Sequence, residues 1–292
     1  MKRAFPILSV ITAVLLAYAL YQALVVAPTD ALQGDVYRII YYHVPSAWTA
    51  FLLFFINFVA SIQYLASAKE STQKAAKWVV IVIGAVGVIA CFLPQVQHLL
   101  PTGMRPSAVA TTVLAIPAFY FFVGKYFPGQ KLDVLAVTSA EVGVVFCTIV
   151  LVTGPIWARP IWGVWWTWDP RLTMTVILWV IYASYLVLRA FGGDDDAVRR
   201  WAAVLAIVGV LDIPIIRVSV QLLPGIHPAV LSRREGGSGL TDPSMRLALY
   251  VSALAVLLLM AWLIALRVRM QRLADEIGEL RRAALAERGE VA

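Results

Sequence analysis

Three histidines, a cluster of tryptophans and a few arginines are the side chains of this sequence best suited to bind a large ligand. His43 stands in the segment YYHVPSAW, two residues before Pro45, and His227 immediately precedes Pro228. Proline suits the first turn of a helix and pushes the residue before it toward an extended conformation. We therefore predict that each imidazole lies just ahead of a helix start. For either residue alone, the alternative is an interfacial histidine bonded to backbone, and we give His98 that ordinary interpretation.

Half of the ten tryptophans lie in a short stretch, residues 157–168, which we call the tryptophan segment. Membrane proteins place tryptophan in belts at both interfaces with water, and a belt would not put five in one loop. The segment is therefore better suited to bury a flat apolar ligand, a lipid tail or a partner helix. Trp162, Trp165 and Trp166 are spaced so that a short surface helix would place them on one face. The remaining two are Trp157 and Trp168.

Asp169 and Pro170, which come directly after the tryptophan segment, form a pair typical of a helix start. Aspartate is favoured at the N-cap and proline at the first helical residue. The same pair recurs at Asp242 and Pro243. Asp169 therefore has a structural explanation and needs no catalytic one.

The elements that must position these residues are membrane helices. The 292 residues are 61% hydrophobic and 14% charged, with a mean hydropathy of +0.82. A soluble domain carries about 25% charged residues, and no single water-soluble core could bury so much apolar surface. We predict an all-α, polytopic integral membrane helix bundle in the lipid bilayer. Its eight predicted transmembrane helices lie at residues 5–27, 47–66, 78–93, 107–123, 134–153, 172–190, 201–222 and 245–266.

Basic residues predict the orientation of the spans, because they concentrate in cytoplasmic loops. They are enriched in the pieces 1–4, 67–77, 124–133, 191–200 and 267–292. Both termini are therefore expected inside (N-in/C-in), and this topology explains the net charge of +7 without a nucleic-acid-binding patch. The outward loops, which contain every histidine, are then 28–46, 94–106, 154–171 and 223–244. We treat residues 1–266 as one transmembrane domain and 267–292 as an amphipathic cytoplasmic tail.

Haem is the ligand class that suits these outer groups together. It is a flat apolar macrocycle with two carboxylates on one edge and an iron that accepts two axial imidazoles. Tryptophans suit the macrocycle, and outer arginines such as Arg38 and Arg171 suit the propionates, because the guanidinium fork can bind both oxygens. Cys91 and Cys147 lie in apolar runs and form no C-x-x-C-H site for covalent attachment.

Three segments of the chain closely resemble the haem exporter protein C (CcmC) family, which carries a tryptophan-rich WWD signature. They are RIIYYHVPSAW, LVTGPIWARPIWGVWWTWDPRLT and LDIPIIRVSVQLLPGIHP, and the resemblance covers about residues 1–66 and 131–266. Members of this family belong to bacterial cytochrome c maturation in the cytoplasmic (inner) membrane. They hold haem at the outer, periplasmic face and help attach it to the haem chaperone CcmE. Their further partners are the ABC transporter subunits CcmA and CcmB and the small protein CcmD.

The resemblance implies a non-covalent haem b whose iron is bound by His43 and His227. It implies that the haem-contacting segment comprises Trp162, Trp165, Trp166, Trp168 and Asp169. Arg38 and Arg171 occupy positions that suit propionate contact. Residues 69–130 depart from the family pattern, and we expect an inserted hairpin, 78–123, that turns six family spans into eight.

Two other functions compete with this one. A haem lyase of the CcmF or CcsA type would join haem to apocytochrome, but those relatives carry additional histidines inside their spans, and this chain has none there. A secondary transporter of an anionic amphiphile would use Glu141, Asp212 and Arg217, since ionisable groups within spans are costly and usually functional or paired. The sequence lacks the internal repeats expected of many such transporters. With no hydrolytic triad or P-loop, we predict a delivery protein rather than an enzyme.

Overall fold

The structure is a computed structural model that describes residues 4–93, 106–193, 195–222, 240 and 242–287. His98 and His227 lie outside the described residues, as does the side chain of Arg217. The predictions for these residues therefore rest on the sequence.

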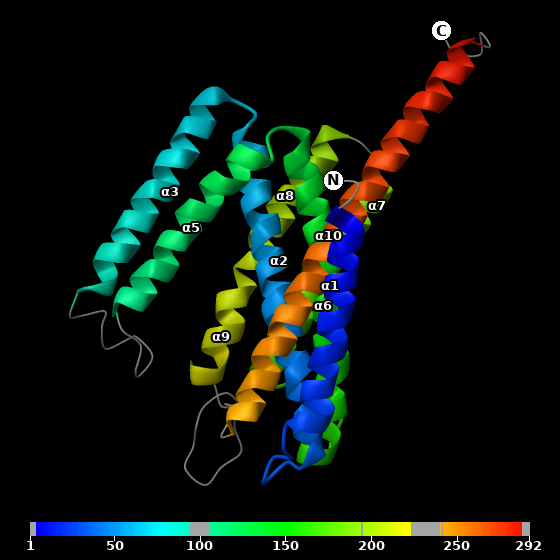
Figure 1. The fold of residues 1–292 in the computed structure, drawn as a ribbon. Helices are drawn as coiled ribbons and strands as arrows, with labels where there is room; N and C mark the ends of the chain where they lie inside the picture. The colour runs from blue at the N-terminus through cyan, green and yellow to red at the C-terminus, as the bar shows by residue number, and fades with distance from the viewer. Residues whose placement is uncertain (1–3, 94–105, 194, 223–239, 241, 288–292) are drawn as a thin grey trace. The chain divides into compact units, whose positions relative to one another are not determined.

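The described segments form helices joined by turns, which confirms the predicted all-α fold class (Figure 1). Seven of these helices are long and apolar enough to cross a membrane, and they correspond to seven of the eight predicted spans. They are α1 (Ala4–Tyr21, continued by a π-helix at Gln22–Val26), α2 (Ile40–Ala66), α3 (Glu70–Cys91), α5 (Pro106–Tyr126), α6 (Gln130–Trp162), α7 (Pro170–Phe191) and α10 (Pro243–Glu287).

The remaining predicted span, 201–222, is not one continuous helix. It folds as α8 (Asp196–Val210) and α9 (Asp212–Leu222), separated at Leu211. Pro214 explains the break, because it has no N–H to donate to the carbonyl of Val210 and its ring would collide with that carbonyl. Proline is tolerated in the first turn of α9, where that N–H has no helical partner. With 15 and 11 residues, neither helix alone reaches the roughly 17 residues that a span requires.

The chain divides into two compact units, which we describe separately. Unit 1 contains Met1–Phe54, Thr138–Ser184 and Gly209–Ala292, and unit 2 contains Phe55–Val137 and Tyr185–Val208. Helices α2, α6 and α7 each contribute one part to each unit.

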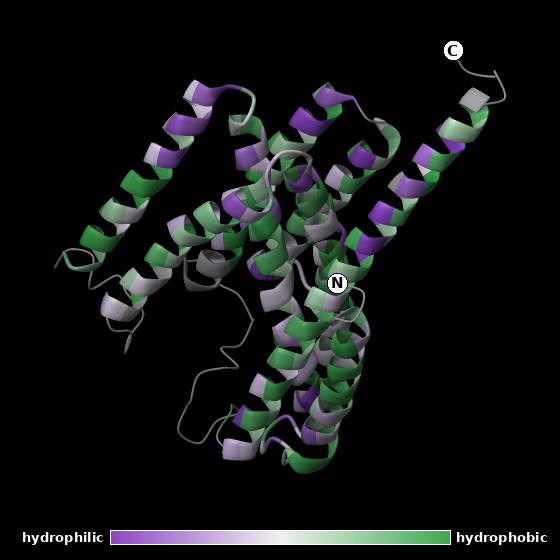
Figure 2. Ribbon diagram, turned by 45° about the horizontal axis from the view of Figure 1, so that its top comes forward, coloured by the Kyte–Doolittle hydropathy of each residue, from purple (hydrophilic) through white to green (hydrophobic). Residues whose placement is uncertain are grey.

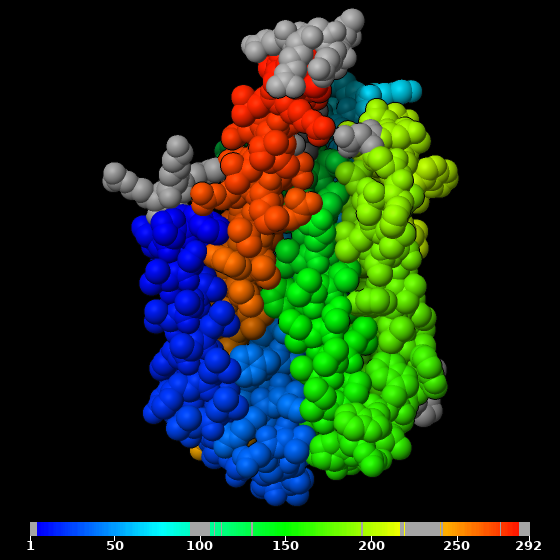
Figure 3. Space-filling model, turned by 90° about the vertical axis from the view of Figure 1, so that its right-hand side faces the viewer, coloured from blue at the N-terminus to red at the C-terminus, as the bar shows by residue number. Residues whose placement is uncertain are grey.

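In unit 1, α1 packs along α10 (Figure 3). The indole Nε1 of Trp262 donates to Ser9 Oγ at 2.8 Å, and its ring stacks on Phe5 with centroids 6.0 Å apart. α10 continues without a break into the predicted tail as far as Glu287, and hydrophilic and hydrophobic residues alternate along its last turns (Figure 2). The tail is therefore an extension of a membrane helix. Docking of the tail to a partner stays a prediction.

The start of α2 is held by a buried cluster within unit 1. Its members come from the end of α1, the start of α2 and the start of α10: Ala23, Ala27, Tyr37, Ile40, Tyr41, Leu240, Met245, Ala248 and Leu249. Because this burial favours helix well before Pro45, α2 begins at Ile40, after a 3-10 turn at Asp35–Ile39. The prediction that His43 precedes a helix start is therefore wrong. His43 lies in the first turn of α2, and Pro45 is inside the helix.

In unit 2, α3 and α5 form the predicted hairpin. Their backbones approach closely at small residues: a Cβ at Gly84 would lie 2.9 Å from Pro117 Cγ, and one at Gly87 would lie 2.8 Å from Val113 Cγ1. Small residues allow such close helix packing in membranes. Elsewhere in unit 2, Arg189 Nη2 donates to Asp133 Oδ2 at 2.7 Å.

Candidate functional site

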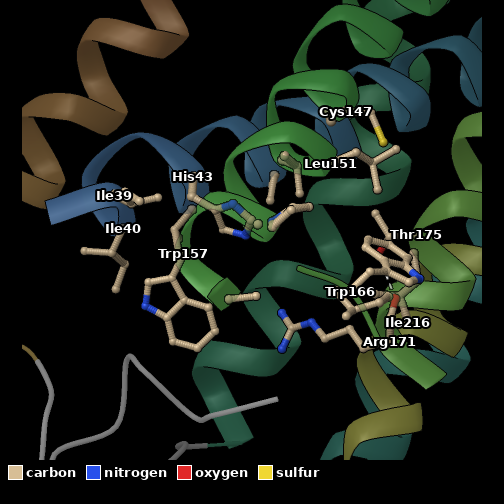
Figure 4. A pocket seen from close by; sticks show the side chains of 18 of the residues that line it. Ile39, Ile40, His43, Cys147, Leu151, Trp157, Trp166, Arg171, Thr175 and Ile216 are labelled. Carbon is tan, nitrogen blue, oxygen red and sulfur yellow. Dashed lines mark hydrogen bonds between the residues drawn. The ribbon is translucent and has the colours of Figure 1, made fainter. Parts of the chain in front are cut away.

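A cavity in unit 1 is bordered by the first turns of α2, the C-terminal part of α6 and the start of α7 (Figure 4). It contains about 1040 Å³ of space free of protein atoms, counting the part open to the outside. Most of its lining is apolar or aromatic. Apolar pockets with a few convergent polar groups are typical small-molecule sites. The residues on which the argument depends are His43, Trp157, Trp162, Trp165, Trp166 and Arg171.

The tryptophan segment reaches this cavity by a route other than the predicted surface helix. α6 ends at Trp162, and Gly163 adopts φ +78°, with its N–H bonded to Arg159 O at 3.0 Å. A left-handed glycine that bonds back four residues is a common helix end. Trp165 and Trp166 come next in non-helical backbone, so the prediction of one shared helical face is wrong. All three predicted tryptophans nevertheless line the cavity.

Trp157 is a lining residue that helical spacing did not select. Its Nε1 donates to Gln33 Oε1 at 2.8 Å, which ties α6 to the loop after α1. Its ring meets Trp162 edge to face, with centroids 5.0 Å apart and an interplanar angle of 80°. The spacing of these two residues does not fit a single helical face, and for that reason helical periodicity missed Trp157.

His43 is the one described histidine, and its half-buried imidazole borders the cavity. Its Nδ1 lies 2.8 Å from Thr153 Oγ1 on α6. On the same helix, Thr153 Oγ1 lies 2.7 Å from the carbonyl oxygen of Ile149. These contacts hold the ring against α6. Thr153 was not anticipated, because 110 positions separate it from His43.

Arg171 brings positive charge to the same cavity. It is the second residue of α7, and its half-buried side chain extends toward the space that His43 and Trp157 border (Figure 4). The exposed N–H groups at a helix start add a partial positive charge. This end of the cavity is therefore suited to an anionic group.

Asp169 caps α7, as predicted. The helix begins at Pro170, and the buried Asp169 Oδ1 accepts the Arg171 N–H at 3.0 Å. Asp242 caps α10 in the same manner, accepting the Ser244 N–H at 2.7 Å. Hydrogen bonds from the Ser244 side chain and backbone lower the pKa of Asp242. Asp169 therefore acts on the cavity through the backbone that places Arg171.

Three of the predicted site residues that the structure describes do not line the cavity: Asp169, Arg38 and Trp168. Arg38 Nη1 donates to the carbonyl oxygens of Ala23 and Ala27, both at 2.7 Å, while its Nε binds Asp35. It thus closes the end of the π-helix that continues α1. Trp168 is 75% exposed and meets the ring of Trp166 edge to face. Contact of Arg38 and Trp168 with a ligand stays a prediction.

Glu141 and Asp212, the two residues of the transporter alternative whose side chains the structure describes, are also outside the cavity lining. Glu141 is paired with Arg267 on α10 by two contacts of 2.6 and 3.1 Å. Asp212 is buried on α9, and its Oδ2 has no hydrogen-bond partner within the part of the chain that the structure describes.

The fold and cavity together define a polytopic helical membrane protein with an aromatic pocket that presents His43 and Arg171. The family model described as Heme exporter protein C matches residues 1–97 and 104–283. The chain therefore belongs to the Heme exporter protein C (CcmC) family of cytochrome c biogenesis, whose members are generally not enzymes. The matched ranges include both α3 and α5, and insertion of this hairpin stays a prediction.

Three relatives illustrate the similarity, and each carries the description Heme exporter protein C. The Bradyrhizobium diazoefficiens protein is 29% identical over 278 residues, covering 95% of this chain and 82% of the relative. The Escherichia coli K12 protein is 30% identical over 244 residues, covering 83% and 73%. The Haemophilus influenzae protein is 26% identical over 271 residues, covering 93% and 85%.

Proposed function

We propose that this protein binds haem b non-covalently in the cavity of unit 1 and passes it to the haem chaperone CcmE. The observation that carries the proposal is the joint placement of His43, the tryptophan segment and Arg171 around one cavity. A haem needs an imidazole for its iron, aromatic walls for its ring and cations for its propionates, and this lining offers all three.

A buried polar atom supports the fit. Trp166 Nε1 is inaccessible to solvent and has no hydrogen-bond partner among the described residues. A buried donor left unpaired costs about 1–3 kcal/mol. A propionate held by Arg171 at the same cavity would supply an acceptor for this N–H, and the ligand would thereby relieve the cost.

The iron ligands are proposed to be His43, on α2, and His227, which precedes α10 in the sequence. His43 supplies its imidazole from a helix anchored by the buried cluster at the start of α2, which limits the positions the ring can take. With both histidines bound, the iron is six-coordinate. Arg38, Trp168 and Asp169 are retained as members of the haem site by resemblance.

Two exposed tryptophans beside the cavity, which we call the rim, support release of haem to a partner protein. Trp165 is 59% exposed and Trp168 is 75% exposed, although large aromatic side chains are usually buried. Exposed aromatic residues beside a pocket are typical of protein-binding surfaces. We propose that the site faces the periplasm in the bacterial inner membrane, with CcmE meeting this rim and CcmA, CcmB and CcmD completing the complex. We propose delivery without catalysis.

The experiment is the visible spectrum of the purified protein, supplied with haem in the absence of CcmE, before and after reduction with dithionite. We expect a low-spin, six-coordinate haem. His43→Ala and His227→Ala should each convert it to a high-spin form or lose it. His98→Ala is the control and should keep the wild-type spectrum. A wild-type protein that binds no haem would refute the proposal.

The two competing functions receive less support. The transporter alternative needs Glu141 as a midplane binding group, but Glu141 is occupied by Arg267. The lyase alternative needs additional histidines within spans, and no span holds a second histidine beside His43 in the sequence.

A further inference from the structure

We infer that Thr153 is a positioning residue that holds His43 in the Nδ1–H tautomer, so that Nε2 carries the free electron pair. This inference rests on the proposed function, in which His43 binds iron. It begins from the two contacts of Thr153 Oγ1: His43 Nδ1 at 2.8 Å and Ile149 O at 2.7 Å.

The single hydroxyl proton of Thr153 decides the tautomer. The carbonyl oxygen of Ile149 can only accept, so the short contact to it is a hydrogen bond only if Thr153 donates. The hydroxyl oxygen then offers its lone pairs to His43 Nδ1, and that contact is a hydrogen bond only if Nδ1 carries the proton. The reverse arrangement would leave two oxygen atoms 2.7 Å apart with no proton between them. A continuous chain therefore runs from Nδ1–H through the hydroxyl to the helix carbonyl.

This assignment leaves Nε2 as the ligand atom. In neutral imidazole one ring nitrogen carries the proton and the other carries the electron pair that a metal requires. Metal-binding histidines commonly donate their second N–H to a neighbouring acceptor, which fixes both the tautomer and the ring orientation. Here Thr153 is that acceptor. Because Thr153 lies on α6 and His43 on α2, the contact also sets the distance between two walls of the cavity.

The chain offers matched variants. Thr153→Val removes the hydroxyl and keeps the shape, whereas Thr153→Ser keeps the hydroxyl. Thr148→Val is the control, because Thr148 also lies on α6 and its hydroxyl likewise bonds the carbonyl four residues before it, Val144 O at 2.7 Å, but its side chain is not part of the cavity lining. Thr153, in contrast, is the threonine whose hydroxyl contacts His43 Nδ1.

The first test uses the haem-free protein in detergent or lipid discs and reads the tautomer from ¹⁵N chemical shifts of the imidazoles. Only three histidines contribute, and His43→Asn identifies the signals of His43. At a pH of about 8, where imidazole is neutral, we expect a protonated Nδ1 and a bare Nε2 in the wild type, in Thr153→Ser and in Thr148→Val. Thr153→Val should lose this preference. A wild-type His43 that is protonated on Nε2 would overturn the inference.

The second test measures haem affinity by titration. Loss of the group that hydrogen-bonds a metal-binding histidine typically weakens metal binding by about 10- to 100-fold. The haem affinity of Thr153→Val should therefore be lower than that of the wild type by about 10-fold or more. The haem affinities of Thr153→Ser and Thr148→Val should stay within about 2-fold of the wild-type value. If Thr153→Val binds haem like the wild type, the inference is overturned and the proposed function stands. If the wild type binds no haem, the proposed function fails, and the tautomer measurement still decides the role of Thr153.

Discussion

Replacement of Arg171 tests whether the cavity recognises the anionic edge of its ligand. The half-buried guanidinium borders the cavity at the start of α7, where the helix dipole adds to its charge. A hydrogen bond to a charged group contributes about 1.5–3 kcal/mol, which corresponds to about 10- to 150-fold in affinity. We therefore expect Arg171→Leu to weaken haem binding by that factor. The haem affinity of Arg171→Lys should lie between those of the wild type and Arg171→Leu, because the lysine ammonium keeps the positive charge but cannot bind both carboxylate oxygens as a guanidinium does.

The ligand provides the control for this prediction. Haem dimethyl ester has the same ring and iron but no charged propionates. Titration of both ligands against the wild type and Arg171→Leu forms a double-mutant cycle, which isolates the interaction between the arginine and the carboxylates. The wild type should prefer haem over the ester, and Arg171→Leu should lose most of that preference. An equal loss of affinity for both ligands would show that Arg171 acts only by shaping the cavity, and the reasoning would be refuted.

Three further predictions concern the surroundings of the site. Glu141→Gln and Arg267→Leu should each lower stability by about 1 kcal/mol, because polar contacts between membrane helices contribute about 0.6–2 kcal/mol; non-additive losses in a thermal-unfolding cycle would demonstrate the pair. Gly163→Ala should lower haem affinity severalfold in the same titration, because φ +78° costs an L-residue about 1–2 kcal/mol and the backbone would shift Trp165; unchanged affinity would contradict this. Trp157→Phe should lose the bond to Gln33 and destabilise the protein by about 1 kcal/mol, and no change in unfolding temperature would count against that contact.

The cap of α7 and the break between α8 and α9 both depend on local sequence. Asp169 with Pro170 predicts the start of α7, and the structure places it there, because capping needs only the side chain and the next few N–H groups. Pro214 carries an equally local signal, but hydropathy alone predicts one continuous span and the backbone breaks at Leu211. The apolar composition indicates burial in lipid, and only the backbone geometry decides whether a buried stretch is one helix or two.

Arg38 and Trp157 show where residue type was insufficient. An outer arginine beside an aromatic site suggests propionate binding, which stays a prediction for Arg38; the structure adds a local role, because Arg38 donates to the carbonyl oxygens of Ala23 and Ala27. Trp157, which precedes the part of the tryptophan segment that the resemblance selected, lines the cavity and makes an edge-to-face contact with Trp162. Both outcomes depend on the direction in which a side chain leaves its element, which residue type does not determine.

The sequence by itself determined the membrane class, the positions of most spans, the two helix caps and the concentration of tryptophan beside one helix end. These properties depend on composition and on contacts within a few residues, so they can be predicted locally. Only the tertiary structure decided that His43 meets Thr153, across 110 positions, and that Glu141 meets Arg267, across 126. Such contacts arise from the way helices pack against one another. That packing depends on the shapes of whole helix faces, and no short sequence pattern encodes it.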